Sequence, residues 1–144
     1  MKYEKLSIDD FAQLIELEQK YKVSIGEPKL NDSQISSLRN AIRDDKIEFF
    51  VAKIQDEIVA ICSISLTFST YLCKMMGIFE DFYVTAEHRK KGIARGLTGY
   101  VFDVLKSREI SSLWVGCADM DLEMYKSLGF TIPLGNLLIW SSDE

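Results

Sequence analysis

The spacing of hydrophobic residues changes period near Glu48, and this change limits the folds that the chain can adopt. Before it, apolar side chains recur at intervals of three and four residues, which predicts one helix over residues 9–21 and a second helix that Asp32 or Ser33 caps. After it, the pattern is typical of strands. Three strands are expected there: residues 48–54, 58–68 and 78–84.

Helical and strand-like patterns alternate in the rest of the chain. Two further helices and two further strands are expected: helices over residues 92–107 and 120–128, and strands over residues 111–118 and 136–140. Such alternation predicts at least one crossover connection between strands. We therefore expect an α/β (α+β) fold, a mixed central β-sheet flanked by about four helices, in a single domain of residues 1–144.

The net charge of −5 limits the classes of partner that the chain can have. Nucleic-acid binders gain affinity by neutralising phosphates, so we expect no nucleic-acid partner for an acidic chain. No apolar run approaches the length of a membrane span, which indicates a cytoplasmic protein with no membrane partner. The single histidine, His88, and three widely separated cysteines argue against a zinc site and a histidine-activated nucleophile, and we expect no metal.

One short segment departs from this acidic background. The stretch "HRKKGIARGLTG", residues 88–99, contains four basic residues and three glycines. It falls between the strand that ends at Val84 and the helix that begins near Gly92, and a helix N-terminus offers unpaired N–H groups to a phosphate. Its glycine spacing matches neither the P-loop nor the dinucleotide-binding motif. The residues alone leave two alternatives, a phosphate site and a solvated loop with glycines that pack a helix.

Three stretches, in order, resemble the GNAT superfamily of N-acetyltransferases. The segment "VTAEHRKKGIA" is similar to the loop that binds the pyrophosphate of acyl-CoA in this family, through Arg89, Gly92 and Ala94. Upstream, "FEDFYV" resembles the central strand of the family, and downstream, "MYKSLGF" resembles its late helix with a tyrosine. The resemblance covers about residues 48–132 and implies a GNAT-like fold, acetyl-CoA as co-substrate and a pyrophosphate site in the basic segment.

The resemblance also implies which residues contact the cofactor. The backbone N–H of Val84 would stabilise the oxyanion, and Phe82 and Val84 would pair with the pantetheine arm like an added strand. The full set of cofactor-binding residues expected in this way is Phe82, Tyr83, Val84, Arg89, Lys90, Lys91, Gly92, Ile93, Ala94 and Arg95. The sequence departs from the family where Ala118 replaces an asparagine that commonly holds the cofactor.

By the same resemblance, Tyr125 is the candidate acid and Glu80 is the candidate base. Proton transfer from an ammonium group of pKa near 10.4 to a carboxylate of pKa near 4.3 is uphill by about six pH units. Glu80 therefore needs a raised pKa, a relaying water or an amine that is desolvated on binding. Strand alternation predicts that Glu80 shares a face with Phe82 and Val84, while Asp81 points the other way.

One side chain, that of Tyr125, is expected near the sulfur of the thioester. A phenol of pKa near 10 is a slightly weaker acid than a thiol of pKa near 8.5, so Tyr125 either only hydrogen-bonds the sulfur or has a lowered pKa. Cys117, at the end of a strand, is expected to be a small buried apolar residue rather than a participant in the reaction.

The acceptor is expected to be a primary amine of a small molecule or a peptide. Glu27, Tyr71 and Asp81 are candidate substrate-binding residues, because carboxylates attract a cationic amine and Tyr71 lies in a connection with adaptable apolar side chains. The alternatives are a non-catalytic module that binds and senses acyl-CoA, and an interaction domain whose basic segment is only solvated. A C-terminal strand over residues 136–140 would also allow a homodimer.

Overall fold

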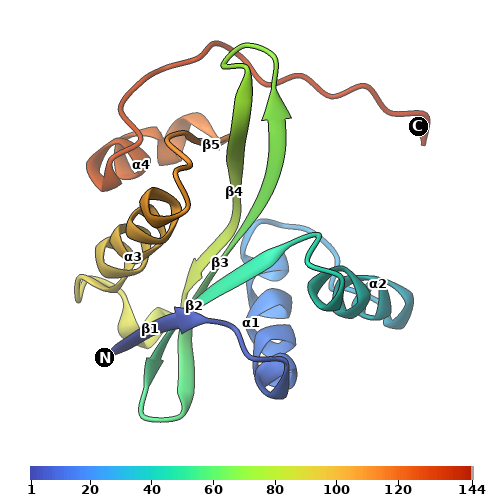
Figure 1. Ribbon diagram of the computed structural model, residues 1–144. Helices are drawn as coiled ribbons and strands as arrows, with labels where there is room; N and C mark the ends of the chain where they lie inside the picture. Colours follow the sequence, from blue (N-terminus) through green and yellow to red (C-terminus); the bar gives the residue numbers. More distant parts are fainter. Residues whose placement is uncertain (144) are drawn as a thin grey trace.

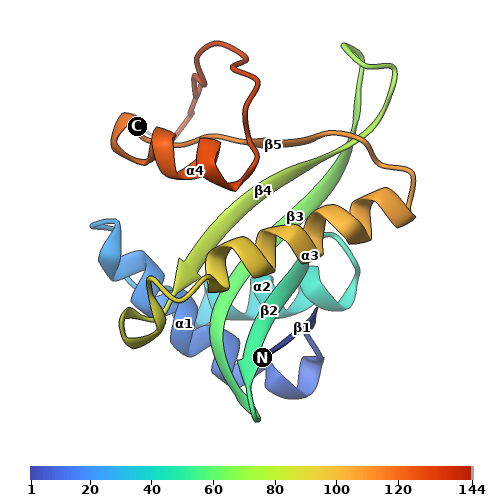
Figure 2. The ribbon, with the colours of Figure 1, turned by 90° about the vertical axis from the view of Figure 1, so that its left-hand side faces the viewer.

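Five strands form one mixed sheet in the order in which they occur along the chain (Figures 1 and 2). They are β1 (Lys2–Lys5), β2 (Glu48–Ile54), β3 (Glu57–Ser69), β4 (Lys74–Val84) and β5 (Leu113–Val115). The pairs β1–β2, β2–β3 and β3–β4 are antiparallel, and the pair β4–β5 is parallel. The computed structural model describes residues 1–143, and Glu144, the last residue of the expected domain, lies outside the described part.

Helices cover both faces of this sheet (Figures 1 and 2). The four α-helices are α1 (Phe11–Ser24) and α2 (Asp32–Arg43) on one face, and α3 (Ile93–Ser107) and α4 (Leu122–Leu128) on the other. Three short 3₁₀ turns accompany them: η1 (Ile8–Asp10), η2 (Ala86–His88) and η3 (Asp119–Asp121). The expectation of a mixed sheet with about four helices is confirmed. No helix among residues 1–143 has the length and apolar character needed to cross a membrane.

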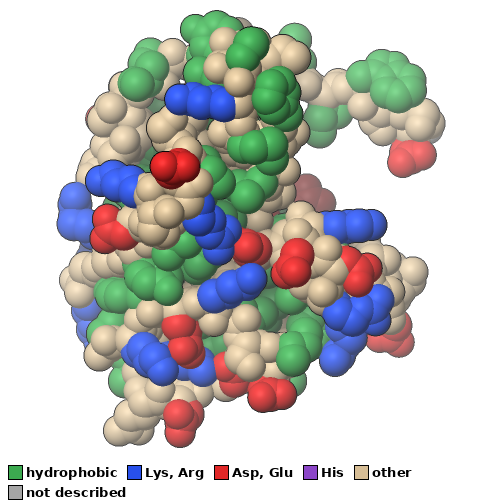
Figure 3. All heavy atoms as spheres, in the orientation of Figure 1, with side chains coloured by type: hydrophobic (Ala, Val, Ile, Leu, Met, Phe, Trp, Pro, Cys, Tyr) green, Lys and Arg blue, Asp and Glu red, His purple; other side chains and the backbone are tan. Residues whose placement is uncertain are grey.

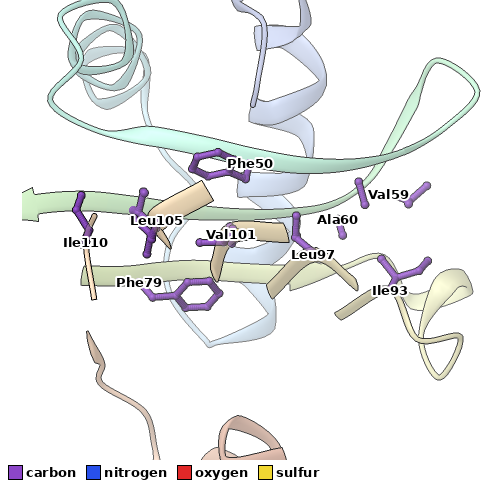
Figure 4. Packing of buried hydrophobic residues seen from close by; sticks show 12 residues of the cluster. Phe50, Val59, Ala60, Phe79, Ile93, Leu97, Val101, Leu105 and Ile110 are labelled. Atoms are coloured by element: carbon purple, nitrogen blue, oxygen red, sulfur yellow. The ribbon is translucent and has the colours of Figure 1, made fainter. Parts of the chain in front are cut away.

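A separate hydrophobic core lies on each face of the sheet. Leu97, Val101 and Leu105 of α3 pack on Phe50 of β2 and Phe79 of β4 (Figure 4). On the opposite face, the buried residues are Leu6, Phe11, Leu14, Leu17, Phe49, Val51, Ile58 and Ile61. Burial of apolar surface on both sides stabilises the folded state by about 25 cal/mol per Å². It also holds the middle of β3 and β4 between the two helix layers.

The C-terminal segment differs from the expectation. Residues 136–140 form no strand, and Leu137, Leu138, Ile139 and Trp140 are between 83% and 89% exposed. After α4 the chain runs past the β3–β4 hairpin and projects from the body, with apolar side chains on the projecting part (Figures 1 and 3). The side chain of Leu137 lies against Gly116, just after β5, but the segment forms no ladder with that strand, so strand propensity alone gave the wrong prediction.

Other element boundaries were also misplaced by the sequence pattern. The strand β1 was not predicted, and β5 covers three residues rather than residues 111–118. The expected connection over residues 69–77 is mostly strand, because β3 and β4 continue as a ladder up to the pair Ser69 and Lys74. Asn31, rather than Asp32 or Ser33, caps α2, and it forms a capping box with Gln34.

Candidate functional site

The strands β4 and β5 separate toward the C-terminal end of β4. Their parallel pairing ends at Phe79 and Val115, although β4 continues to Val84. The last residues of β4 therefore have β3 on one side and no strand on the other. This opening faces the C-terminal end of α1 and the N-terminal end of α3 (Figure 2). It is the place where a ligand can reach the backbone of the central sheet.

Val84 directs its backbone polar groups into this opening. In antiparallel pairing, the N–H and C=O groups of alternate residues point to the same neighbour. The N–H of Thr85 donates to the carbonyl of Val59 on β3 at 2.9 Å, so the preceding residue points away from β3. The Nε of Arg89 donates to the carbonyl of Val84 at 2.9 Å, which agrees with this direction. The N–H of Val84 is thus aimed at the space between β4 and β5.

The N-terminus of α3 forms a second wall of the opening. Its N-cap residue, Gly92, has φ of +80°, a left-handed conformation that glycine adopts without steric cost. A Cβ at this position would meet nothing within 4 Å, so the backbone surface is open. The cap makes no side-chain hydrogen bond to the helix, and the first-turn N–H groups are left for an anion.

Between these walls lies a cleft of about 970 Å³. Of the residues expected to bind the cofactor, all except Lys91 line it: Phe82, Tyr83, Val84, Arg89, Lys90, Gly92, Ile93, Ala94 and Arg95. Tyr21, Ser24 and Ile25 at the end of α1 line it from the other face of the sheet. Strand β4, its basic loop and the start of α3 therefore meet at one cleft.

Two expected substrate-binding residues lie elsewhere. Tyr71 is 77% exposed in the turn that joins β3 to β4, so it lies at the opposite end of β4 from Val84 and the cleft. Ten residues of strand separate the two ends of β4, roughly 33 Å. Glu27 is exposed just beyond the end of α1, two residues past the last α1-side residue in the cleft wall. The structure brings neither side chain into the cleft.

Tyr125 enters the cleft from α4 and is held by aromatic neighbours. Its ring lies 5.8 Å from that of Phe130, 6.2 Å from that of Phe82 and 6.4 Å from that of Phe79, measured between ring centroids. Gly129 ends α4 with φ of +120°, and the N–H of Phe130 then donates to the carbonyl of Tyr125. The motif "LGF" thus closes the helix and orients the tyrosine.

The phenol of Tyr125 is a weak acid in this environment. Burial raises the pKa of Tyr125 well above its ordinary value, and nearby acidic groups, Asp121 and Cys117 among them, add to the rise. The alternative of a lowered pKa is therefore wrong, and the hydroxyl is protonated at neutral pH. Cys117 is exposed and lines the cleft, so the expectation of a buried apolar cysteine is also wrong. The short β5 ends before Cys117 and leaves this side chain uncovered.

A β-bulge in β4 changes the face on which Glu80 lies. Ser63 pairs with Glu80 and Ile61 with Tyr83, so Asp81 and the next residue together oppose a single residue of β3. Asp81 has φ of +52°, in the left-handed region. Phe79 and Phe82 both pack on the α3 face, although strict alternation would separate them.

The prediction that Glu80 shares the face of Phe82 and Val84 was therefore wrong. The bulge inserts one residue after Glu80 and returns Phe82 to the α3 face. Glu80 is exposed on the α1 face, where its charge contributes to a raised pKa of Tyr21.

A buried carboxyl group on α1 that was not among the expected site residues faces the bulge. Glu18 is 1% exposed, and its Oε1 atom has no hydrogen-bond partner among residues 1–143. Burial raises the pKa of Glu18 far above its ordinary value, and the adjacent Asp81 raises it further by charge repulsion and by a hydrogen bond between the two carboxyl groups. Glu18 follows Phe11 and Leu14 at helical spacing, and this spacing is the signal by which the sequence could have placed it on the apolar face of α1.

Tyr21, one turn after Glu18, connects this pair to the cleft wall. Burial, together with the charges of Asp81, Glu18, Glu80 and Asp121, raises the pKa of Tyr21 to about 12. Its ring meets that of Tyr83 edge-on, with centroids 6.4 Å apart. The α1 side of the cleft is thus acidic and aromatic, whereas the α3 side is basic.

Comparison with known proteins gives one family and many structures of the same fold. The model of the acetyltransferase (GNAT) family matches residues 11–130. A crystal structure of a probable acetyltransferase superposes with a TM-score of 0.89 at 21% identity, over 100% of both chains. A predicted acetyltransferase from Clostridium acetobutylicum, solved with acetyl-CoA, gives a TM-score of 0.79 at 21% identity, over 96% of this chain and 94% of the other.

Glucosamine-6-phosphate N-acetyltransferase from Arabidopsis thaliana is a third similar structure. It gives a TM-score of 0.76 at 20% identity, over 99% of this chain and 98% of the other. Among curated proteins, no relative of significant similarity was found. At these identities the solved structures support the fold, and the family model supports the classification.

Proposed function

Since this chain belongs to the acetyltransferase (GNAT) family, we propose that it transfers the acetyl group of acetyl-CoA to a primary amine of a small molecule or peptide. The observation that carries this proposal is the convergence of three donors on one cleft. The first-turn N–H groups of α3, the N–H of Val84 and the hydroxyl of Tyr125 all belong to residues that line the cleft. In that order, the three donors suit the pyrophosphate, the thioester oxygen and the leaving sulfur of acetyl-CoA.

The α3 end of the cleft suits the pyrophosphate of acetyl-CoA. Backbone N–H groups of Ile93 and Ala94 are in the uncapped first turn of the helix, which carries a partial positive charge. Arg95 and Lys90 add full charges at the cleft wall. Arg89 is already tied to Val84 through its Nε, so its role includes holding the loop against the end of β4.

The chemistry required of these residues follows from the bonds that change. A C–N bond forms as the C–S bond of the thioester breaks, the amine loses a proton, and the departing sulfur carries the negative charge. The N–H of Val84 donates to the thioester oxygen as charge develops on it, and removal of one such donor typically lowers kcat by 10²–10³-fold in similar oxyanion sites. The amine attacks directly in a ternary complex, with no covalent intermediate on the protein.

Tyr125 supplies the hydrogen bond to the leaving sulfur. Because its phenol is protonated at neutral pH, it is available as a donor throughout the physiological range. Its aromatic surroundings favour a neutral hydroxyl over a phenolate. Glu80, exposed on the α1 face beside the acidic groups, is the proposed base and acts through water.

Related structures give independent support for an amine acceptor. The Arabidopsis enzyme is named as an N-acetyltransferase of an amino sugar, and an aminoglycoside acetyltransferase from a soil metagenomic sample was crystallised with sisomicin. The Clostridium structure contains acetyl-CoA. A non-catalytic module that senses acyl-CoA would keep the α3 end of the cleft and would have no requirement for Tyr125.

The experiment that tests the proposal measures release of free CoA thiol from acetyl-CoA in the presence of a panel of primary amines. The wild-type protein should release thiol only when an amine is present. Arg95→Glu should weaken acetyl-CoA binding, because it places a negative charge at the pyrophosphate end, whereas Lys106→Glu at the far end of α3 is the matched control. Binding of acetyl-CoA without thiol release for any amine would favour the sensing module.

Three expectations from the sequence stay predictions of this proposal: a cytoplasmic location, no resident metal and a homodimer. The exposed apolar residues 137–140 are the segment through which two copies would associate. Analytical ultracentrifugation over a range of protein concentrations tests the dimer.

A further inference from the structure

The cleft contains one acidic side chain, that of Asp121. Among residues 1–143, Asp121 is the single carboxylate that lines the cleft, whereas the charged side chains from the loop after β4 and from α3 are basic. Glu27, Glu80 and Asp81, the acidic residues that the sequence indicated for an amine, do not line it. A primary amine is mainly an ammonium ion at neutral pH. Asp121 is therefore the cleft residue whose charge is opposite to that of the acceptor.

The fold itself makes no use of the carboxylate of Asp121. This residue is the N-cap of α4, where an aspartate commonly accepts a hydrogen bond from a backbone N–H of the first turn. Here the side chain forms no such bond. Within the described residues 1–143 it forms no ion pair either, and it is exposed. The carboxylate is thus available to a ligand in the cleft.

Asp121 lies on the same side of α4 as Tyr125. Residues four positions apart on a helix are neighbours, with Cβ atoms about 5–6 Å apart, and both of these side chains line the cleft. Burial and the nearby Tyr21 are the larger causes of the raised pKa of Tyr125, and the charge of Asp121 adds to them. The carboxylate therefore lies about one helical turn from the place where the thioester sulfur is proposed to leave.

Tyr21 faces Asp121 from the opposite wall. The end of α1 and the start of α4 lie on opposite sides of the opening, and each contributes residues to the cleft (Figure 2). Burial and the carboxylates near the bulge are the larger causes of the raised pKa of Tyr21, and Asp121 acts on it as well. Two phenols and one carboxylate thus surround one region of the cleft. This region is separate from the N-terminus of α3, where the pyrophosphate is proposed to bind.

A carboxylate in this position affects the reaction through its charge. As the C–S bond of the thioester breaks, negative charge moves to the sulfur, and a like charge close by raises the energy of that state. The attacking nitrogen carries a positive charge from the moment it bonds to the thioester carbon until its proton leaves through water to Glu80. A nitrogen held against Asp121 offsets the negative charge of the carboxylate during this step. A carboxylate on the acceptor would add to the repulsion instead.

We propose that Asp121 binds the positively charged nitrogen of the acceptor beside Tyr125 and selects against acceptors that carry a carboxylate next to their amine. This inference deepens the proposed acetyltransferase function and rests on it. The preferred acceptors are amines with no negative charge on the neighbouring carbon, a class that includes peptide N-termini and excludes free amino acids. The ring of Tyr21 presents an aromatic surface to the same cation.

The test compares two probes of the same shape that differ in one negative charge, phenylalanine amide and phenylalanine. The measured quantity is the ratio of their kcat/KM values with acetyl-CoA, amide over acid. It is measured for the wild type, for Asp121→Asn, which removes the charge, and for Asp121→Glu, which keeps it. Asp119→Asn is the matched control, because Asp119 belongs to the same short turn, is also exposed and does not line the cleft.

The wild type should prefer the amide, and Asp121→Asn should lower the ratio about tenfold, the effect of removing one of two like charges about 5–7 Å apart in a partly solvated site. Asp121→Glu should restore most of the preference, and Asp119→Asn should leave it unchanged. A purely structural role for Asp121 would lower both kcat/KM values together and keep their ratio. That result, or a wild type that does not prefer the amide, would overturn the inference.

Binding of acetyl-CoA and release of its thiol separate this inference from the proposed function. If acetyl-CoA stabilises the wild type and amines release thiol, but the ratio is the same in Asp121→Asn, the role of Asp121 is wrong and the acetyltransferase function stands. If acetyl-CoA neither stabilises the protein nor releases thiol with any amine, the proposed function is wrong and this inference falls with it.

Discussion

Replacing Glu18 by glutamine should change how the stability of the protein depends on pH, even with no ligand present. In the unfolded chain this carboxyl group ionises near the ordinary glutamate pKa of 4.5, whereas in the fold its pKa is raised by burial and by Asp81. Folding therefore takes up a proton at any pH between these two values. The contribution of Glu18 to stability is complete below the unfolded pKa and decreases as pH rises toward the folded pKa.

The size of this effect follows from linkage. Within that window, each pH unit removes about 1.4 kcal/mol from the free energy of unfolding. Between about pH 5.5 and pH 7.5 the wild type should lose up to about 3 kcal/mol that Glu18→Gln does not lose. For a chain of this length this corresponds to roughly 6–12 °C in melting temperature. The glutamine can still donate a hydrogen bond to Asp81, as the protonated carboxyl group does.

The assay is thermal unfolding by circular dichroism at several pH values between about 5 and 8, for the wild type, Glu18→Gln and Glu16→Gln. We expect the curve of melting temperature against pH for Glu18→Gln to diverge upward from that of the wild type as pH rises. The curve of Glu16→Gln should run parallel to that of the wild type, since Glu16 is exposed. Parallel curves for Glu18→Gln and the wild type would refute the argument that this carboxyl group is buried and protonated.

Further predictions concern the hydroxyl of Tyr125 and the glycines of α3. Tyr125→Phe should lower kcat by at least about tenfold, because a donor to the leaving sulfur is lost. Binding of acetyl-CoA, measured by calorimetry, should stay within about twofold of the wild type. Equal losses of kcat and of binding would contradict this role. Gly96→Ala should destabilise the protein by about 1–3 kcal/mol in urea unfolding, since its Cβ would collide with the ring of Tyr3. At Gly99 a Cβ would meet nothing within 4 Å. Gly99→Ala should therefore be neutral or stabilise α3 by up to about 1 kcal/mol. A decrease in the free energy of unfolding of Gly99→Ala would count against the packing argument.

The sequence predicted the parts of the fold that depend on local pattern. The helix over residues 93–107 and its basic loop were located because helical periodicity and a positive-φ glycine act over a few residues. Of the two alternatives for the basic segment, the phosphate site stays a prediction, and the glycines differ in their surroundings. Gly92 opens the helix N-terminus toward the cleft, whereas Gly96 allows α3 to pack on Tyr3.

The features that the sequence did not reveal depend on tertiary contacts. The bulge at Asp81 arises from the pairing of β4 with β3, and no residue pattern in "FEDFYV" marks it. It reversed the expected face of Glu80 and brought Asp81 to Glu18. The C-terminal residues 136–140 have strand propensity but form no ladder with a neighbouring strand, so propensity alone gave the wrong result.

The central claim is that the cleft between β4 and the N-terminus of α3 binds acetyl-CoA, and thermal unfolding with and without this ligand tests it most directly. At an acetyl-CoA concentration about 100 times its dissociation constant, the fold should gain ~2.7 kcal/mol and melt several degrees higher. The increase should be clearly smaller in Arg95→Glu and retained in Lys106→Glu. An unchanged melting temperature of the wild type at millimolar acetyl-CoA would contradict the account.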